Sequence, residues 1–229
     1  MSQQEIKKMF DAAVHIGHRT QKWNPKMKKF IHTEKNGVHI INLEKTLDCL
    51  GKALLFLSKL AAEGKIILFV STKPQAVKLF EEAARECGLP YVVSKWIPGL
   101  VTNFATLKTR IKYFVNLKLQ DASGELNKYT KKEISKFRKV IDKLQPSFGG
   151  IEQLTQKPDA IFLADTVRDH IVVSEANKLK IPVVGIVDTN SDPSLVDYPI
   201  PGNDDSLKSL AYFVEKVKES IQSARKTKK

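Results

Sequence analysis

Two stretches, residues 65–72 (KIILFVST) and 158–188 (PDAIFLADTVRDHIVVSEANKLKIPVVGIVD), decide the fold of this 229-residue chain. The runs IILFV, AIFLA and VVGIV are short, continuous and apolar, which is typical of strands buried on both faces of a parallel sheet. Predicted helices over 74–87 and 168–180 follow the first two of these runs. Strands that alternate with helices predict an α/β fold built on an open, mostly parallel sheet.

Toward both ends of these stretches the sequence predicts further elements. They are a helix over 4–13, a β-hairpin that turns at Asn36-Gly37, a helix over 43–62 that ends before Gly64, a strand over 90–93, an edge strand over 198–203, and a helix over 204–223 capped by Asn203 or Asp204.

The segment between the two strand–helix–strand units has a different period. Apolar residues recur at intervals of three and four over 102–120 and again over 130–145, and Thr130 with Glu133 forms a capping box. This pattern predicts an antiparallel coiled-coil hairpin that projects as an arm. We therefore divide the chain into an α/β body (1–101 and 146–223), an inserted arm (102–145) and a basic flexible tail (224–229).

Charge is unevenly distributed along the chain. The net charge is +13, of which residues 102–145 contribute +7, whereas residues 150–214 contribute −5. Basic segments beside an acidic segment indicate that some faces of the protein bind a polyanion and that others do not. No apolar run reaches the ~20 residues that span a bilayer. The two cysteines, Cys49 and Cys87, are typical of small buried residues, and we expect a cytoplasmic protein without a membrane partner.

An enzyme is not favoured by these residues. An open parallel sheet often binds nucleotides, but no glycine lies between Ser71 and Gly88, where a phosphate-binding loop would follow the first buried strand. No local signature places a nucleophile beside a base and an orienting acid. The sequence therefore predicts a protein without catalytic residues, a required cofactor or a small-molecule substrate.

Basic residues gather around two tryptophans, in 18–29 (HRTQKWNPKMKK) and at the entry to the arm (SKWIPGLVTNF). Cations neutralise phosphates and an exposed tryptophan can stack on a base, although Trp23 packed into the core, with its lysines solvated, is an equal alternative. The predicted RNA-binding residues are Arg19, Lys22, Trp23, Asn24, Lys26, Lys28, Lys29, Lys73, Lys95, Trp96, Asn103, Lys108, Arg110, Lys131, Lys132, Lys136, Arg138, Lys139, Arg225 and Lys226.

Two acidic loops are expected at one edge of the sheet. Asp188 and Asp192 follow a buried strand, and Asp204 and Asp205 stand at a helix start, so a divalent cation shared with His18 is one interpretation. The other is that Asp192 and Asp204 cap a turn and a helix.

Seven stretches resemble one known family, the bacterial-type small-subunit ribosomal protein S-two (S2). They are AAVHIGHRTQKWNPKMKKFI (12–31), NGVHIINLEKT (36–46), KWIPGLVTNFATLK (95–108), FGGIEQL (148–154), KPDAIFLAD (157–165), EANKLKIPVVGIVDTNSDP (175–193) and YPIPGNDDSLKSL (198–210). They occur in family order over nearly the whole chain. One departure is Pro98, where the family usually has glycine.

The resemblance implies a flavodoxin-like α/β domain with an inserted coiled-coil arm. It also implies a structural role in the small ribosomal subunit, in contact with ribosomal RNA between head and body and with neighbouring ribosomal proteins, including the mRNA-binding protein S-one. The residues that match the family's motifs are His15, His18, Trp23, Asn24, Pro25, Lys28, Trp96, Gly99, Thr102, Asn103 and the loops 188–192 and 202–205.

Overall fold

A computed structural model describes residues 3–226 and contains a five-stranded, fully parallel sheet. Its strands are β4 (Ile67–Val70), β5 (Tyr91–Val92), β6 (Ala160–Leu163), β7 (Val183–Val187) and β8 (Tyr198–Pro201). They lie in the order β5-β4-β6-β7-β8, which is 2-1-3-4-5 along the chain and therefore flavodoxin-like. The predicted α/β fold is confirmed.

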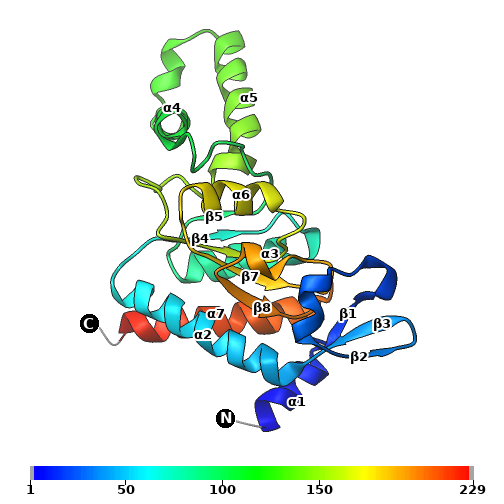
Figure 1. The fold of residues 1–229 in the computed structure, drawn as a ribbon. Helices are drawn as coiled ribbons and strands as arrows, with labels where there is room; N and C mark the ends of the chain where they lie inside the picture. The colour runs from blue at the N-terminus through cyan, green and yellow to red at the C-terminus, as the bar shows by residue number, and fades with distance from the viewer. Residues whose placement is uncertain (1–2, 227–229) are drawn as a thin grey trace.

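Helices cover both faces of this sheet, as Figure 1 shows. One face carries α2 (Leu43–Ala62), α3 (Pro74–Glu86) and α7 (Leu207–Lys226), with α2 and α7 packed side by side. The other carries α4 (Phe104–Ala122) and α6 (His170–Lys178).

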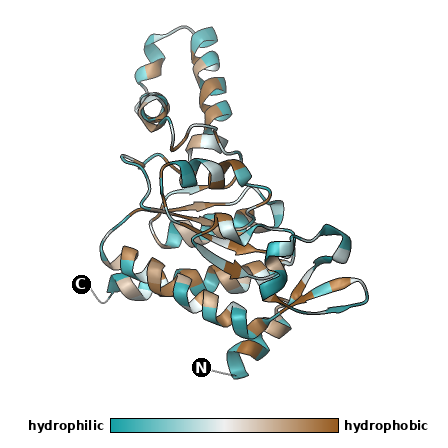
Figure 2. Ribbon diagram, viewed as in Figure 1, coloured by the Kyte–Doolittle hydropathy of each residue, from teal (hydrophilic) through white to brown (hydrophobic). Residues whose placement is uncertain are grey.

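Successive strand residues point to opposite faces, so each strand supplies two separate cores. Ile67 and Phe69 of β4 belong to the cluster with α2, α3 and α7, whereas Leu68 and Val70 belong to the cluster with α4 and α6. Hydrophobic residues accordingly concentrate on the central strands in Figure 2. In the part of the chain that the structure describes, no helix is both long and apolar enough to cross a membrane.

A smaller antiparallel sheet stands beside the N-terminal helix α1 (Gln3–Asp11). It is formed by β1 (Ile16–Arg19), β2 (Ile31–Lys35) and β3 (Val38–Ile41) in the order β1-β3-β2. The predicted hairpin is β2–β3, and its turn residues Asn36 and Gly37 both have positive φ (52° and 73°). Strand β1 and the 3-10 helices η1 (Thr20–Lys22) and η2 (Pro25–Phe30) were not predicted from the sequence.

The arm rises from the body above β5 and α6 (Figure 1) and consists of α4, η3 (Glu125–Lys128) and α5 (Lys131–Phe148). Asp121 meets Arg138 at 3.0 Å, and the Phe114 ring lies 6.1 Å from that of Phe148, so the helices pair in opposite directions. The capping box of Thr130 and Glu133 is present. The chosen domain boundaries stay a prediction, although Leu107, Ile111 and Phe114 of α4 share one core with the sheet.

The C-terminal region differs from the prediction. Helix α7 begins at Leu207 and continues to Lys226, so residues 224–226 form its last turn and not a flexible tail. Arg225 donates a hydrogen bond from its guanidinium to the Cys87 carbonyl, which anchors this turn on the end of α3. Residues 227–229 of the predicted tail lie outside the described residues.

Both edge strands of the parallel sheet are unusual. At one edge, β5 has only two residues. At the other, β8 (YPIP) carries Pro199 and Pro201, which pair with Gly185 and Val187 of β7. Proline has no backbone N–H and is tolerated in a strand only at such an edge. The η4 turn (Pro193–Leu195) precedes this strand.

Candidate functional site

Most of the predicted RNA-binding side chains are exposed, and they lie on two surfaces. The first surface, which we call the N-terminal basic surface, is formed by β1, η1 and η2 and presents Arg19, Lys22, Trp23, Lys26, Lys28 and Lys29. The second, the arm surface, presents Arg110, Lys131, Lys132, Lys136, Arg138 and Lys139, with Lys108 partly buried. Lys95, Asn103 and Lys226 are exposed elsewhere on the chain.

Contacts within the protein fix the conformation of the N-terminal basic surface at several residues. The Asn24 side chain accepts from Lys26 N–H at 3.0 Å and begins η2, which places Met27 and Phe30 in the core. Trp23 is 39% exposed, with its ring tilted against His39 at a centroid distance of 5.2 Å. This exposure leaves the Trp23 face available to a partner, whereas Asn24 serves mainly to shape the turn.

Two predicted RNA-binding residues are buried, and this corrects their assignment. Lys73 is 6% exposed and its ammonium faces three carboxylates. Trp96 is 6% exposed, and its indole N–H donates to Glu175 at 3.1 Å. A side chain enclosed in this way cannot reach a phosphate or a base. Arg225 is also partly occupied, by its bond to Cys87.

Glu175, on α6, holds the segment that leads into the arm. Its two oxygens accept from Trp96 Nε1, from the N–H groups of Gly99, Val101 and Thr102, and from the Thr102 hydroxyl, at 2.6–3.3 Å. Burial alone would raise the pKa of Glu175, but these hydrogen bonds outweigh it and lower the pKa. The sequence reading missed this residue, because only the fold brings α6 beside the loop.

A charged cluster lies at the carboxyl edge of the parallel sheet, beyond the ends of β4 and β6. Lys73 follows β4, and its Nζ lies 3.3 Å from Asp165, which follows β6. The same Nζ lies 2.7 Å from both Asp204 and Asp205. Burial would lower the pKa of Lys73, but the carboxylates, Asp204 foremost, raise it above its ordinary value. The lysine is therefore held as a buried cation.

His18 joins this cluster from β1. Its Nδ1 lies 3.1 Å from Asp188 Oδ2, and its Nε2 lies 3.4 Å from Asp205 Oδ2. The hydrogen bond to Asp188 raises the pKa of His18. Burial, together with the carboxylates of Asp188 and Asp165, raises the pKa of Asp204 to about 7, against the opposing effect of Lys73.

The structure therefore brings together four of the five candidate cation ligands. His18, Asp188 and Asp204 offer ligand atoms within 4.8 Å of one another, and Asp205 stands beside them. Asp192 lies outside this group, because its carboxylate binds Lys26 at 2.6 Å and caps η4 through Ser194 N–H at 2.9 Å. For Asp192 the capping interpretation is the right one.

The position where a flavodoxin-like sheet usually binds a nucleotide phosphate is filled by protein. Asp169 accepts from Thr72 N–H at 3.1 Å and from the Thr72 hydroxyl at 2.7 Å, immediately after β4. A carboxylate at this backbone N–H repels an incoming phosphate, so the geometry disfavours a phosphate at this position.

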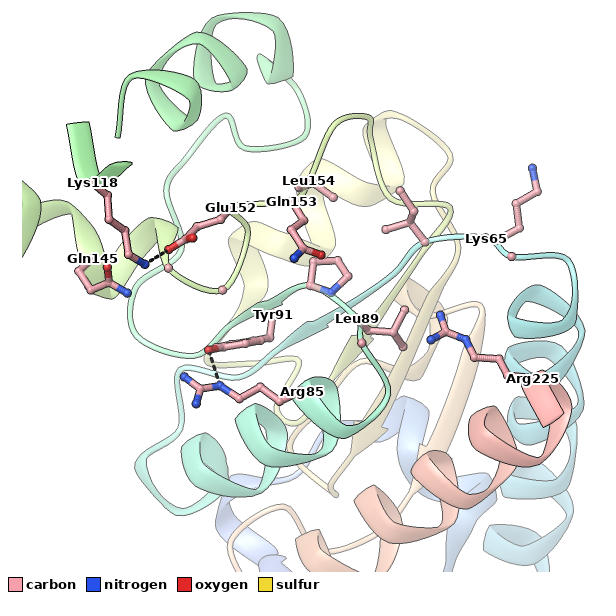
Figure 3. A pocket seen from close by; sticks show the side chains of 16 residues that line it. Lys65, Arg85, Leu89, Tyr91, Lys118, Gln145, Glu152, Gln153, Leu154 and Arg225 are labelled. Carbon is pink, nitrogen blue, oxygen red and sulfur yellow. Dashed lines mark hydrogen bonds and ion pairs between the residues drawn. The ribbon is translucent and has the colours of Figure 1, made fainter. Parts of the chain in front are cut away.

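A cavity of about 580 Å³ opens at the opposite, amino edge of the sheet (Figure 3). Four cationic side chains line it, namely Lys65, Arg85, Lys118 and Arg225. Arg85 donates to the Tyr91 hydroxyl at 2.9 Å, and Lys118 of the arm pairs with Glu152 at 2.7 Å. The sequence reading assigned only Arg225 of these, since the other three lie on separate elements without a shared motif.

Comparison with known proteins agrees with this architecture. The family described as Ribosomal protein S2 matches residues 9–224. The small ribosomal subunit protein uS2 of Dictyoglomus turgidum is 44% identical over 220 residues, which cover 96% of this chain and 89% of that protein. The uS2 protein of Campylobacter concisus is 44% identical over 220 residues, covering 96% of this chain and 84% of that protein.

These matches extend over nearly all of the described elements, and they agree with the resemblance found in the seven sequence stretches. The family is one of ribosomal proteins and not of enzymes. The chain belongs to the ribosomal protein S2 family of the small ribosomal subunit.

Proposed function

We propose that this chain is held in the small subunit by the N-terminal basic surface and the arm surface, which bind ribosomal RNA. The observation that carries the proposal is the separation of charge in the fold. Most of the exposed cations predicted to bind RNA lie on β1–η2 and α4–α5, whereas the acidic segment 150–214, with a net charge of −5, forms much of the sheet and its carboxyl edge.

The mechanism is electrostatic placement. Lysine and arginine side chains that neutralise phosphates release condensed counterions, so binding weakens steeply as salt rises. Folded ribosomal RNA is recognised mainly by shape and backbone, and little sequence discrimination is expected. The role needs no cofactor, and we place it in the cytoplasm, where the subunit is assembled.

Contact with neighbouring ribosomal proteins, including S-one, forms the second part of the proposal. It is supported by family membership and by large exposed apolar side chains, which the phosphates of an RNA backbone would not cover. Phe10 is 59% exposed and Leu55 is 73% exposed. Apolar side chains of this kind suit a protein partner better than an RNA backbone.

Sedimentation through sucrose gradients tests the RNA-binding proposal. A tagged chain in lysate should migrate with small subunits at low salt and move to the top of the gradient as salt is raised. The logarithm of the bound-to-free ratio should fall linearly with the logarithm of salt concentration. A chain that stays bound with no salt dependence would show that apolar contacts, and not cations, hold it in place.

A further inference from the structure

The cavity of about 580 Å³ at the amino edge of the sheet has the size of a small-molecule site, since such sites span about 300–1,000 Å³. Three of its cationic side chains come from three different helices: Arg85 from α3, Lys118 from α4 and Arg225 from α7. Lys65 also lines the cavity, but Figure 3 shows its side chain pointing away from these three. Because they lie on separate helices, the fold and not a local sequence pattern brings the three cations to one cavity.

The ends of two helices explain part of this charge. Arg85 and Arg225 stand in the last turns of α3 and α7, where a cation offsets the negative end of the helix dipole. Lys118 has no such role, because it lies before the last turn of α4, which contains no basic residue. The helix ends therefore do not account for the full set of cations in the cavity.

The present partners of these cations leave them able to bind an anion. Lys118 pairs with Glu152 at 2.7 Å and Arg85 with a glutamate of its own helix at 2.6 Å, but all four side chains are at least 27% exposed, and such ion pairs contribute little to stability. Among the described residues Arg225 forms no ion pair, and its guanidinium donates to the neutral carbonyl of Cys87. Each guanidinium has five N–H groups, so both arginines keep donors for a ligand.

The rest of the lining suits an organic group. Leu89, Pro90 and Leu154 form an apolar part of the cavity wall, with the Tyr91 ring beside them. Gln153 adds an exposed amide that can donate and accept hydrogen bonds. A ligand that matches both parts of the lining carries an anionic group on an apolar or flat body.

We propose that this cavity binds a phosphorylated ligand, with the phosphate between Arg85, Lys118 and Arg225 and the organic part against the apolar wall. Phosphate is favoured over a carboxylate, because its larger number of oxygens can meet three cations from separate helices, and the arginine fork matches its geometry. A free mononucleotide offers this chemistry, and so does one nucleotide of an RNA strand. The site shares no residue with the N-terminal basic surface or the arm surface, and it does not depend on RNA binding by either.

Glu152 opposes the ligand from inside the cavity. Its carboxylate holds Lys118 at 2.7 Å, so a phosphate must displace it or lie beside it, and the like charges repel each other. Removal of this carboxylate should therefore strengthen the binding of a phosphate, whereas removal of the cations should weaken it. The two kinds of variant thus test the site with opposite signs.

Isothermal titration calorimetry of the full chain at low salt tests the proposal, with adenosine 5′-monophosphate as the free ligand and a short single-stranded RNA as the strand. The cavity variant Arg85→Gln, Lys118→Gln should weaken binding of the nucleotide by about tenfold or more, because each hydrogen bond to a charged group is worth roughly that factor. The variant Glu152→Gln should strengthen it by roughly threefold, as expected for a repulsion between exposed charges.

Matched controls separate the cavity from general charge effects. Lys52→Gln, Lys78→Gln also removes two positive charges, and both lysines are exposed, outside the cavity and outside the predicted RNA-binding residues. Glu44→Gln removes an exposed carboxylate from the start of α2. Both controls should bind the nucleotide as the wild type does. Circular dichroism checks that every variant folds, and if the cavity variant does not, Glu152→Gln and its control decide the outcome.

The result also identifies the source of the phosphate. Binding of the nucleotide that the cavity variant weakens would establish a site for a free phosphorylated ligand. Binding of the RNA alone, weakened by the cavity variant and not by Lys52→Gln, Lys78→Gln, would show that the phosphate comes from a strand. The site would be overturned if neither probe distinguished the cavity variant from its control, or if Glu152→Gln left the affinity unchanged.

Discussion

A single buried carboxylate, Glu175, connects α6 to the segment that leads into the arm. Its five donors include three backbone N–H groups between Gly99 and Thr102, a stretch with no regular secondary structure of its own. Such groups are costly to bury without partners, so one side chain replaces the hydrogen bonds that a strand or helix would supply. The entry to the arm is therefore set by α6.

Replacing Glu175 with glutamine should destabilise the protein by about 2–3 kcal/mol, because the amide NH₂ would face donors that now meet an acceptor. The lowered pKa gives a pH dependence with a defined sign. The stability that Glu175 contributes is present above its unfolded value of about 4.5 and is lost as pH falls through the lower, folded-state pKa.

Urea unfolding followed by circular dichroism between pH 3 and pH 7 measures both effects. The wild type should lose stability more steeply with acid than Glu175→Gln does, so the two curves converge at low pH. Leu179→Ala, in a partly buried residue just beyond the same helix, is a control that should lower stability without changing its pH dependence. Parallel curves for Glu175→Gln and the wild type would contradict the role of the carboxylate.

Sequence patterns singled out residues that could form a site, but they did not predict which distant residues contact them. Lys73 precedes Pro74 at a helix start, which is a position typical of an exposed lysine, yet Asp204 meets it from 131 residues away. Trp96 likewise finds Glu175 from 79 residues away. By contrast, the approach of the loops that carry Asp188 and Asp204 was expected from the position of both loops at one edge of the sheet, whereas His18 reaches them from the unpredicted strand β1. The sequence was therefore sufficient to predict proximity only where the order of the parallel strands determines which loops lie together.

At the scale of elements, the arm offers the sharpest test of RNA binding. Lys131 and Lys132 open α5, and Lys136 lies one turn later, all three exposed. Acidic residues are favourable in the first turn of a helix, where the backbone dipole is positive. Glutamate at Lys131 and Lys132 therefore suits the helix start, and Lys136 is exposed, so the three changes should leave α5 intact while they remove three cations from the arm surface.

We expect the triple variant Lys131→Glu, Lys132→Glu, Lys136→Glu to bind small subunits at least tenfold more weakly and to lower the salt slope by about three. The measurement is sedimentation at several salt concentrations, with circular dichroism as the check on folding. The matched control reverses three exposed lysines of the acidic segment, Lys157, Lys178 and Lys208. Equal binding by both triple variants would exclude a specific role for the arm surface.

Most elements were predicted to within a few residues, because buried strands and amphipathic helices have strong periods. The predicted helix 43–62 coincides with α2, whose start is fixed by the Asn42 side chain. Two helix ends were wrong. The second arm helix continues past Pro146 to Phe148, whose side chain is buried in the core, and α7 continues to Lys226, where Arg225 donates to the Cys87 carbonyl. Strand β1 was missed because its four residues (IGHR) do not alternate.

At the scale of the whole molecule, burial is graded from the sheet outward. Every residue of β4, β6 and β7 is buried, whereas Phe148 is the one fully buried residue among those of α5. Amide hydrogens open to solvent with free energies that follow local burial, from nearly zero up to the global value. The arm and the sheet should therefore differ widely in local stability.

Hydrogen exchange followed by mass spectrometry measures this gradient in the full chain. Peptides from β6 and β7 should exchange slowest, through global unfolding, and peptides from α5 should exchange fastest among the long helices. Helix α2 is the internal control, because it has similar length but buries Leu50, Ala53, Leu57 and Ala61. Protection of α5 equal to that of β6 would show that the arm unfolds only together with the sheet.

The two edge strands of the parallel sheet affect the chain before it meets RNA. With Pro199 and Pro201 on β8 and only two residues in β5, neither margin offers the row of free N–H groups that recruits another strand. A newly made copy that has not yet joined a subunit is therefore protected against aggregation by strand pairing at the edges of its parallel sheet. Its exposed cations, in contrast, stay open to any nucleic acid until the subunit covers them.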